Sequence, residues 1–211
     1  MLTISPDGRE LADLLPPRGE RFLLGITGSP GAGKSTLATA LAATCHAVVV
    51  PMDGFHLADV ELARRGLLDR KGAPETFDPE GYAALLARIQ ARPAHVVMAP
   101  MFERDLEQPI AGAIPVPPSA TLVVTEGNYL LLDDAHWHDV RRSLDAVWHV
   151  VTEDSVRLGR LLRRHVASGK DLETAHAWIE RVDQPNAVRI EAARFRADQV
   201  LDLTDWHGTV S

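Results

Sequence analysis

The chain has 211 residues, of which 45% are hydrophobic and 24% are charged, a composition that fits one globular α/β domain. Its formal net charge of −7 argues against a nucleic-acid-binding protein, which would carry a basic surface. The single cysteine, Cys45, excludes an internal disulfide framework, and the N-terminus lacks the features of a signal peptide. Because no apolar run is long enough to span a membrane, we expect a cytoplasmic protein without nucleic-acid or membrane partners.

Apolar runs alternate with helix-like segments along the whole chain. In the first part we expect a strand at 21–27, a helix at Ser35–Thr44, a strand at Ala47–Met52, a helix from Pro79 to about Gln90 with Asp78 as its N-cap, and strands at His95–Met98 and Thr121–Thr125. In the second part we expect a strand at Ala146–Val151, a helix at about Asp154–Val166, a long helix from about Asp171 that is broken near Pro185, and a last strand at Gln199–Leu203. The proline-rich segment Pro109–Ser119 is expected to be an irregular surface connection. Continuously apolar strands that alternate with helices predict one doubly wound α/β domain with a mainly parallel sheet and helices on both faces.

A glycine-rich segment lies between the first expected strand and the first expected helix. It reads Gly28-Ser29-Pro30-Gly31-Ala32-Gly33-Lys34-Ser35 and matches the phosphate-binding loop (P-loop) pattern G-x-x-x-x-G-K-[ST] in full. Backbone N–H groups of such a loop and the helix N-terminus after it bind phosphates. We expect Lys34 to reach the β- and γ-phosphates of ATP and the Ser35 hydroxyl to ligate Mg²⁺. The predicted nucleotide-binding residues are Gly28, Ser29, Pro30, Gly31, Ala32, Gly33, Lys34, Ser35 and Thr36.

The P-loop alone leaves the class of protein open, because GTPases, motor ATPases and metabolite kinases share it. A GTPase would carry an N-K-x-D motif, and neither asparagine of the chain, Asn128 or Asn186, is followed by lysine. Two acids point to a kinase: Asp53 and Glu126 each follow a buried strand. The carboxyl ends of parallel strands meet at one sheet edge, so one acid could deprotonate a substrate hydroxyl while the other positions Mg²⁺.

The helix expected at about Asp154–Val166 carries three arginines on one face. At about 100° per residue, Arg157, Arg160 and Arg164 fall within an arc of roughly 60°. Beside a triphosphate they could stabilise the transferring phosphoryl group, although a solvated charged face is the simpler alternative. A lid at approximately 154–184 follows from the first interpretation, with Gly169 as the break between its two helices.

Five segments together resemble the phosphoribulokinase/uridine kinase family of P-loop kinases. They are Gly28–Ser35, Met52-Asp53-Gly54-Phe55-His56, Arg70–Asp78, Glu126-Gly127-Asn128-Tyr129-Leu130 and Arg157–His165. The likeness is greatest to a bacterial subgroup described as nucleoside/nucleotide kinase-like or as fructose-transport-associated kinases, and the chain is also similar to bacterial pantothenate kinase. The resemblance implies that Asp53 is the general base and that Glu126 helps to hold Mg²⁺. It also implies that Arg160 and Arg164 are catalytic lid residues, and that a homo-oligomer is possible.

The acceptor-binding segment departs from that of the uridine kinases. These enzymes read the base with a tyrosine and a histidine, and the corresponding stretch Pro100–Glu107 has neither. Gly72 stands where they carry a ribose-binding aspartate. The residues expected to bind the acceptor are His56, Lys71, Phe102 and Arg104, with Glu75 and Glu103 nearby. We therefore expect a kinase for a sugar such as fructose or a similar polyol, with a uridine-like or pantothenate-like acceptor, a regulatory ATPase and a nucleotide sensor as the alternatives.

Overall fold

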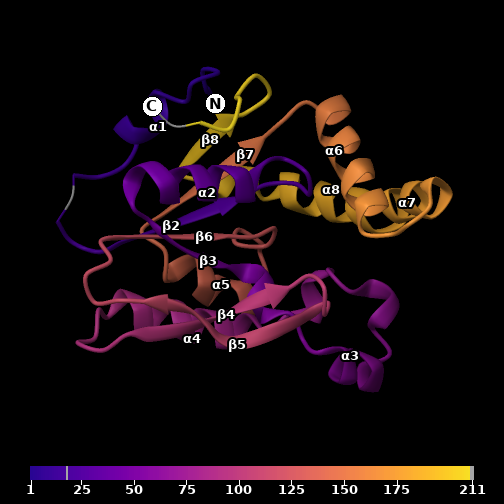
Figure 1. Cartoon of the computed structure of the whole chain (residues 1–211), viewed down its shortest axis with the longest axis horizontal. Coiled ribbons are helices and arrows are strands. Elements are labelled where there is room, and N and C mark those ends of the chain that lie inside the picture. Colours follow the sequence, from indigo (N-terminus) through magenta and orange to yellow (C-terminus); the bar gives the residue numbers. More distant parts are fainter. Residues whose placement is uncertain (18, 210–211) are drawn as a thin grey trace.

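The computed structural model describes residues 1–17 and 19–209 (Figure 1). Its larger sheet has six strands, all parallel, in the order β1-β8-β7-β2-β6-β3. In that order the strands are β1 (Leu2–Thr3), β8 (Gln199–Asp202), β7 (Ala146–Val151), β2 (Phe22–Thr27), β6 (Leu122–Glu126) and β3 (Val48–Pro51). The predicted parallel α/β sheet of a P-loop protein is thereby confirmed. The edge strand β1 has only two residues, too few for a recognisable pattern in the sequence.

Eight α-helices surround the sheet in the described part of the chain. They are α1 (Glu10–Asp13), α2 (Lys34–Cys45), α3 (Asp59–Arg65), α4 (Pro79–Gln90), α5 (Ala135–Arg142), α6 (Asp154–Ala167), α7 (Leu172–Trp178) and α8 (Gln184–Ala192). The predicted start of α4 is confirmed, since the Asp78 side chain accepts a hydrogen bond from the Gly81 N–H at 2.9 Å. Helix α5 was not predicted; Asp134 caps it by accepting from the N–H of His136.

Helices cover both faces of the sheet because successive strand residues point in opposite directions. Leu23 of β2 packs into a core shared with α4, α5 and α8, whereas its neighbour Leu24 packs into a core shared with α1 and α2. Figure 1 shows α2 and the α4–α5 pair on opposite sides of the strands. No helix in residues 1–17 and 19–209 combines the length and apolarity needed to cross a bilayer.

The predicted break near Pro185 takes the form of a π-helical turn. Residues Ile179–Asp183 are π-helical and join α7 to α8 without a loop. Pro185 lies in the first turn of α8. Because proline has no N–H, the backbone carbonyl four residues earlier, at Arg181, lacks its usual α-helical partner. The wider turn accommodates this loss, so the chain continues from α7 into α8 without a break in helical conformation.

The segment Pro109–Ser119, expected to be irregular, is mostly a strand, so that prediction is wrong. Strand β5 (Gln108–Val116) pairs antiparallel with β4 (Val97–Glu103) in a separate two-stranded sheet. Each strand of such a ribbon has one unpaired edge, where proline is tolerated. The ribbon lies against the short 3₁₀ helix at Met52–Phe55: a side chain at Gly54 would come within 2.6 Å of the Pro100 carbonyl oxygen. The middle of β4 is therefore held beside the segment that follows β3.

Candidate active site

The P-loop wraps the N-terminus of α2 directly after β2. Gly28 has φ +151°, and a Cβ there would come within 2.3 Å of the Val150 carbonyl oxygen, so only glycine fits. The Lys34 side chain is buried, and its Nζ donates to the carbonyl oxygens of Gly28 at 2.8 Å and Ser29 at 3.2 Å. Burial lowers the pKa of Lys34 to about 8, which still leaves the ammonium mostly charged at neutral pH. The loop thus holds a desolvated positive charge at its centre, as anion binding requires.

Ser35 and Glu126 form a hydroxyl–carboxyl pair beside Lys34. Ser35 Oγ donates to Glu126 Oε1 at 3.0 Å, and Glu126 is buried at the end of β6. Burial, followed by the nearby charge of Asp53, raises the pKa of Glu126. A divalent cation would remove this unfavourable charge balance, and it prefers such oxygen ligands. The donor set therefore fits Mg²⁺.

Asp53 lies at the same edge of the sheet as Glu126. It follows β3, whose residue Pro51 is directly opposite Glu126 in the register of the β3–β6 pair. Both carboxyls line one cavity, as the sequence predicted from the ends of their strands. Their separate roles, as base and as metal anchor, stay predictions.

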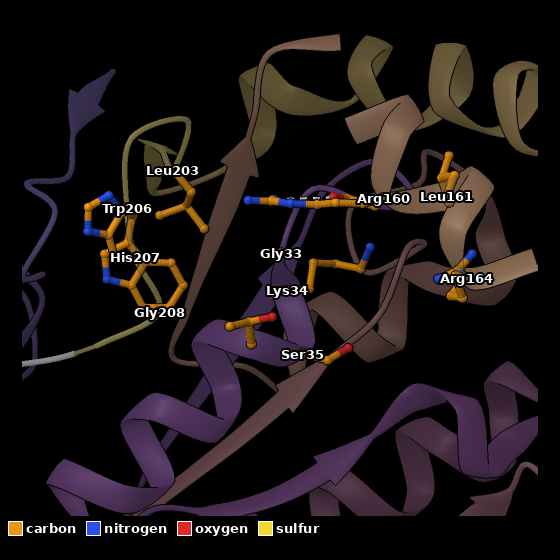
Figure 2. A pocket seen from close by; sticks show the side chains of 12 residues that line it. Gly33, Lys34, Ser35, Arg160, Leu161, Arg164, Leu203, Trp206, His207 and Gly208 are labelled. Carbon is orange, nitrogen blue, oxygen red and sulfur yellow. Dashed lines mark hydrogen bonds between the residues drawn. The ribbon is translucent and has the colours of Figure 1, made fainter. Parts of the chain in front are cut away.

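A first cavity of about 360 Å³ opens over the P-loop (Figure 2). It is lined by Gly31, Gly33, Lys34, Ser35, Thr36, Arg160, Leu161, Arg164, Leu203, Trp206, His207 and Gly208. The last four residues follow β8 and were not predicted. The one feature of the sequence that could have pointed to them is their position after the final strand, at the sheet edge where ligands bind. Of the other predicted nucleotide-binding residues, Pro30 lines the second cavity described below, and the Ser29 hydroxyl points away to donate to Glu191 Oε1 at 2.8 Å. Gly28 and Ala32 line neither of these two cavities.

A second cavity, also of about 360 Å³, lies between the β4–β5 hairpin and helices α6 and α7. All four residues predicted to bind the acceptor line it, together with Asp53, Glu126 and Gly72; the four are His56, Lys71, Phe102 and Arg104. Glu75 and Glu103, which were expected nearby, do not line it; Glu75 instead pairs with Arg70. Lys34, Ser35 and Arg164 line both cavities. The two cavities therefore meet at the P-loop lysine.

Aromatic rings fix the wall of the second cavity next to Asp53. His56 Nδ1 donates to the Asp53 carbonyl oxygen at 2.8 Å, and its ring lies 4.0 Å from that of Phe77 and 4.8 Å from that of Phe102, between centroids. Burial lowers the pKa of His56, so the ring is neutral at neutral pH. Lys71 Nζ donates to Asp59 Oδ1 at 2.7 Å and lies 5.4 Å from the Phe102 ring centroid. This wall is rigid and offers both polar and aromatic contacts.

The arginine face of α6 divides into two parts. Arg160 and Arg164 line the cavities, and Figure 2 shows the Arg160 side chain extending over Lys34 toward Leu203. Arg157, by contrast, is buried and does not reach either cavity. Its Nη1 donates to the Pro30 carbonyl oxygen at 3.3 Å, and its Nη2 donates to Gln184 Oε1 at 2.6 Å. Arg157 therefore fits neither alternative weighed from the sequence, since it is neither at a cavity nor solvated, and it fastens α6 to the P-loop and to α8.

Several lining residues of the second cavity come from α6, the connection after it, α7, the π-helical turn and α8; none was predicted as a site residue, although all but Asn186 fall in the segment 154–184 expected to form a lid. They are His165, Ser168, Lys170, Trp178, Val182, Asp183 and Asn186. His165 Nε2 and Asp183 Oδ2 are 2.7 Å apart in a buried pair that ties α6 to the π-helical turn. These side chains converge only because α6 and α7 fold back on each other, which no local motif encodes.

Comparison with known proteins agrees with a kinase site of this kind. The sequence profile of the "Phosphoribulokinase / Uridine kinase family" matches residues 23–204. The candidate uridine kinase C227.14 of Schizosaccharomyces pombe is 32% identical over 182 residues, 81% of this chain and 77% of its own length. A pantothenate kinase of Bacillus velezensis is 30% identical over 88% of this chain and 69% of its own length. The crystal structure of a candidate fructose transport system kinase from Silicibacter sp. TM1040 superposes with a TM-score of 0.80 at 40% identity, covering 90% of this chain and 94% of that one. The chain is therefore a phosphotransferase that belongs to the phosphoribulokinase/uridine kinase family.

Proposed function

We propose that the protein transfers the γ-phosphate of ATP to a hydroxyl group of a small polyhydroxylated metabolite. One observation carries the proposal: a cavity over the P-loop and a cavity over Asp53 meet at Lys34, Ser35 and Arg164. Phosphoryl transfer needs nucleotide and acceptor to meet in line at one point, and a nucleotide-only ATPase has no use for the second cavity.

The residues divide the chemistry between them. Bound nucleotide places its base beside Leu203, Trp206 and His207, and its γ-phosphate near Lys34. Asp53 accepts the proton of the acceptor hydroxyl as the oxygen attacks the γ-phosphorus and the bond to ADP breaks. Lys34, Arg160 and Arg164 balance the charge on the phosphoryl oxygens.

The metal site belongs to the same arrangement. Ser35 and Glu126 are the residues that would hold Mg²⁺, which screens the charge of the β- and γ-phosphates when bound. Binding there needs Glu126 ionised, although burial raises its pKa in the metal-free protein. The Ser35 hydroxyl donates to Glu126 and keeps the carboxyl oriented toward the loop.

The lining of the second cavity favours a compact, polar acceptor. It offers charged and hydrogen-bonding groups with one aromatic wall, and its segment Pro100–Glu107 lacks the tyrosine and histidine with which uridine kinases read a base. Gly72 lines it where those enzymes carry a ribose-binding aspartate. A site that cannot pair with the polar groups of a ligand discriminates strongly against it. A sugar such as fructose or a similar polyol is our first candidate, in line with the name of the Silicibacter relative. A pantothenate-like compound comes second, in line with the Bacillus relative.

Acceptor-dependent ADP release tests the proposal. Sugars, sugar derivatives, nucleosides and pantothenate are compared at saturating Mg-ATP, and the phosphorylated product is identified by mass spectrometry. We expect a polyol to stimulate ADP release and uridine and cytidine to be poor acceptors. Uridine turnover with kcat/KM in the usual enzyme range of about 10⁴–10⁸ M⁻¹s⁻¹ would restore the uridine kinase reading. ATP hydrolysis that no acceptor stimulates would favour a regulatory ATPase, and tight ATP binding without turnover a nucleotide sensor.

A further inference from the structure

Two cations that line the second cavity have no carboxylate partner. Arg104, at the tip of the β4–β5 hairpin, makes no ion pair within the described chain, and the same is true of Lys170, which follows α6. Lys170 Nζ lies 5.2 Å from the Trp178 ring centroid, which holds its ammonium in place. In a protein with a formal net charge of −7, two cations without an ion-pair partner that line the same cavity are a feature that calls for a ligand.

The other charged groups of this cavity already have partners or an assigned task. Lys71 pairs with Asp59 at 2.7 Å, and Glu107 Oε2 lies 4.0 Å from the same ammonium. Asp183 is paired with His165 at 2.7 Å and lies 3.9 Å from Arg164. Asp53 and Glu126 are the proposed base and metal anchor. Once these groups are paired, Arg104 and Lys170 remain as surplus positive charge.

Neither cation is placed to serve the nucleotide. Arg104 and Lys170 line the second cavity and are absent from the lining of the first, unlike Arg160 and Arg164. They belong to different elements that both line the second cavity, the β4–β5 hairpin and the α6–α7 connection. An acceptor bound between these elements would therefore meet both positive charges.

The cost of desolvation decides what such an acceptor must carry. Binding a neutral polyol would displace water from Arg104 and Lys170 without supplying a counter-charge, and a desolvated unpaired charge is costly. A carboxylate or phosphate ester would instead form charge-assisted hydrogen bonds with them. We infer that the acceptor is an anionic polyol, a sugar acid or a sugar phosphate, whose negative charge is balanced by Arg104 and Lys170 in the second cavity. This inference rests on the proposed kinase function and specifies its substrate class.

The test uses acceptors that differ only in charge. Fructose is compared with fructose 1-phosphate and fructose 6-phosphate, glucose with gluconate and glucose 6-phosphate, and glycerol with glycerate and glycerol 3-phosphate. The phosphate and carboxylate members separate the two sources of negative charge. The variants are Arg104→Gln, Lys170→Gln and, as a control, Arg163→Gln, since Arg163 is exposed on α6 and lines neither cavity.

We expect at least one anionic acceptor to exceed its neutral counterpart in kcat/KM by about tenfold or more. Arg104→Gln and Lys170→Gln should each raise its KM by about tenfold to a hundredfold, the usual worth of a hydrogen bond to a charged group. In both variants the ratio of anionic to neutral kcat/KM should fall toward one, while Arg163→Gln keeps the wild-type ratio. Neutral acceptors that match or exceed their anionic counterparts, with a ratio that the two variants leave alone, would overturn this inference and leave the kinase function standing. Absence of any acceptor-dependent ADP release would instead overturn the proposed function.

Discussion

Arg157→Ala is the substitution for which the structure makes its clearest quantitative prediction. Residue Arg157 is only 4% exposed. Its side chain connects its own helix α6 to the P-loop and to α8. Its contact with Asp154 is at the surface, where ion pairs contribute little. The bonds to the buried Pro30 carbonyl and to Oε1 of the half-buried Gln184 are the ones that matter, because their loss leaves both acceptors without this donor.

The magnitude follows from those two bonds. A hydrogen bond from a charged group contributes about 1.5–3 kcal/mol, and the two share one guanidinium, so we expect a loss of about 3 kcal/mol in the free energy of unfolding. For a domain of this size, that corresponds to a fall in Tm of roughly 6–12 °C. The loosened P-loop should also bind ATP more weakly at temperatures where the variant is still folded.

The loss of stability is measured by urea unfolding and by thermal melts. The proteins compared are the wild type, Arg157→Ala and Arg163→Ala. Arg163 is exposed on the same helix, and its replacement should change stability by less than about 0.5 kcal/mol. ATP affinity is measured by titration well below the Tm of each variant. If Arg157→Ala melts within a degree or two of Arg163→Ala, Arg157 does not fasten α6 to the P-loop and the reasoning fails.

Three further predictions concern the chemistry. Lys34→Ala should weaken ATP binding and abolish turnover while the fold is retained by circular dichroism, because the central cation of the P-loop is lost; wild-type ATP affinity in this variant would exclude Lys34 from the nucleotide site. Asp53→Asn should reduce kcat by about 10²–10⁴-fold with ATP affinity largely kept, since the amide cannot accept the hydroxyl proton; a change confined to ATP affinity would make Asp53 a metal or structural residue instead. Arg164→Ala should lower kcat more than it raises the KM for ATP, as measured by steady-state kinetics, because Arg164 lies where the two cavities meet. An unchanged kcat with a raised KM would assign Arg164 to ground-state binding alone.

Local sequence was sufficient for the P-loop, the parallel sheet and the two acids. The pattern of Gly28–Ser35 is contiguous, so its spacing alone specifies the turn that it forms between β2 and α2. Asp53 and Glu126 are far apart in the chain, but each directly follows a buried strand. Because parallel strands end at a common edge, the position of an acid after its strand is enough to predict that the two meet.

Only the tertiary structure showed the features that depend on contacts between different helices and strands. The period of α6 places Arg157 near Arg160 and Arg164, but only the packing of α6 on the P-loop shows that Arg157 is buried and bonded to Pro30 and Gln184. The β4–β5 hairpin was missed because proline content reads as irregular structure, whereas a ribbon with free edges accepts it.

The same reason separates the two halves of the candidate site. The nucleotide half is built mainly from one contiguous motif, which a sequence displays directly. The acceptor half collects side chains from the segment after β3, the hairpin, α6, α7, the π-helical turn and α8, and their convergence depends on packing between elements distant in sequence. Sequence by itself therefore determined the P-loop and the two acids beside it. Only the fold brought Arg104 and Lys170 to one cavity, because the pairing state of a charge depends on neighbours that the linear order does not reveal.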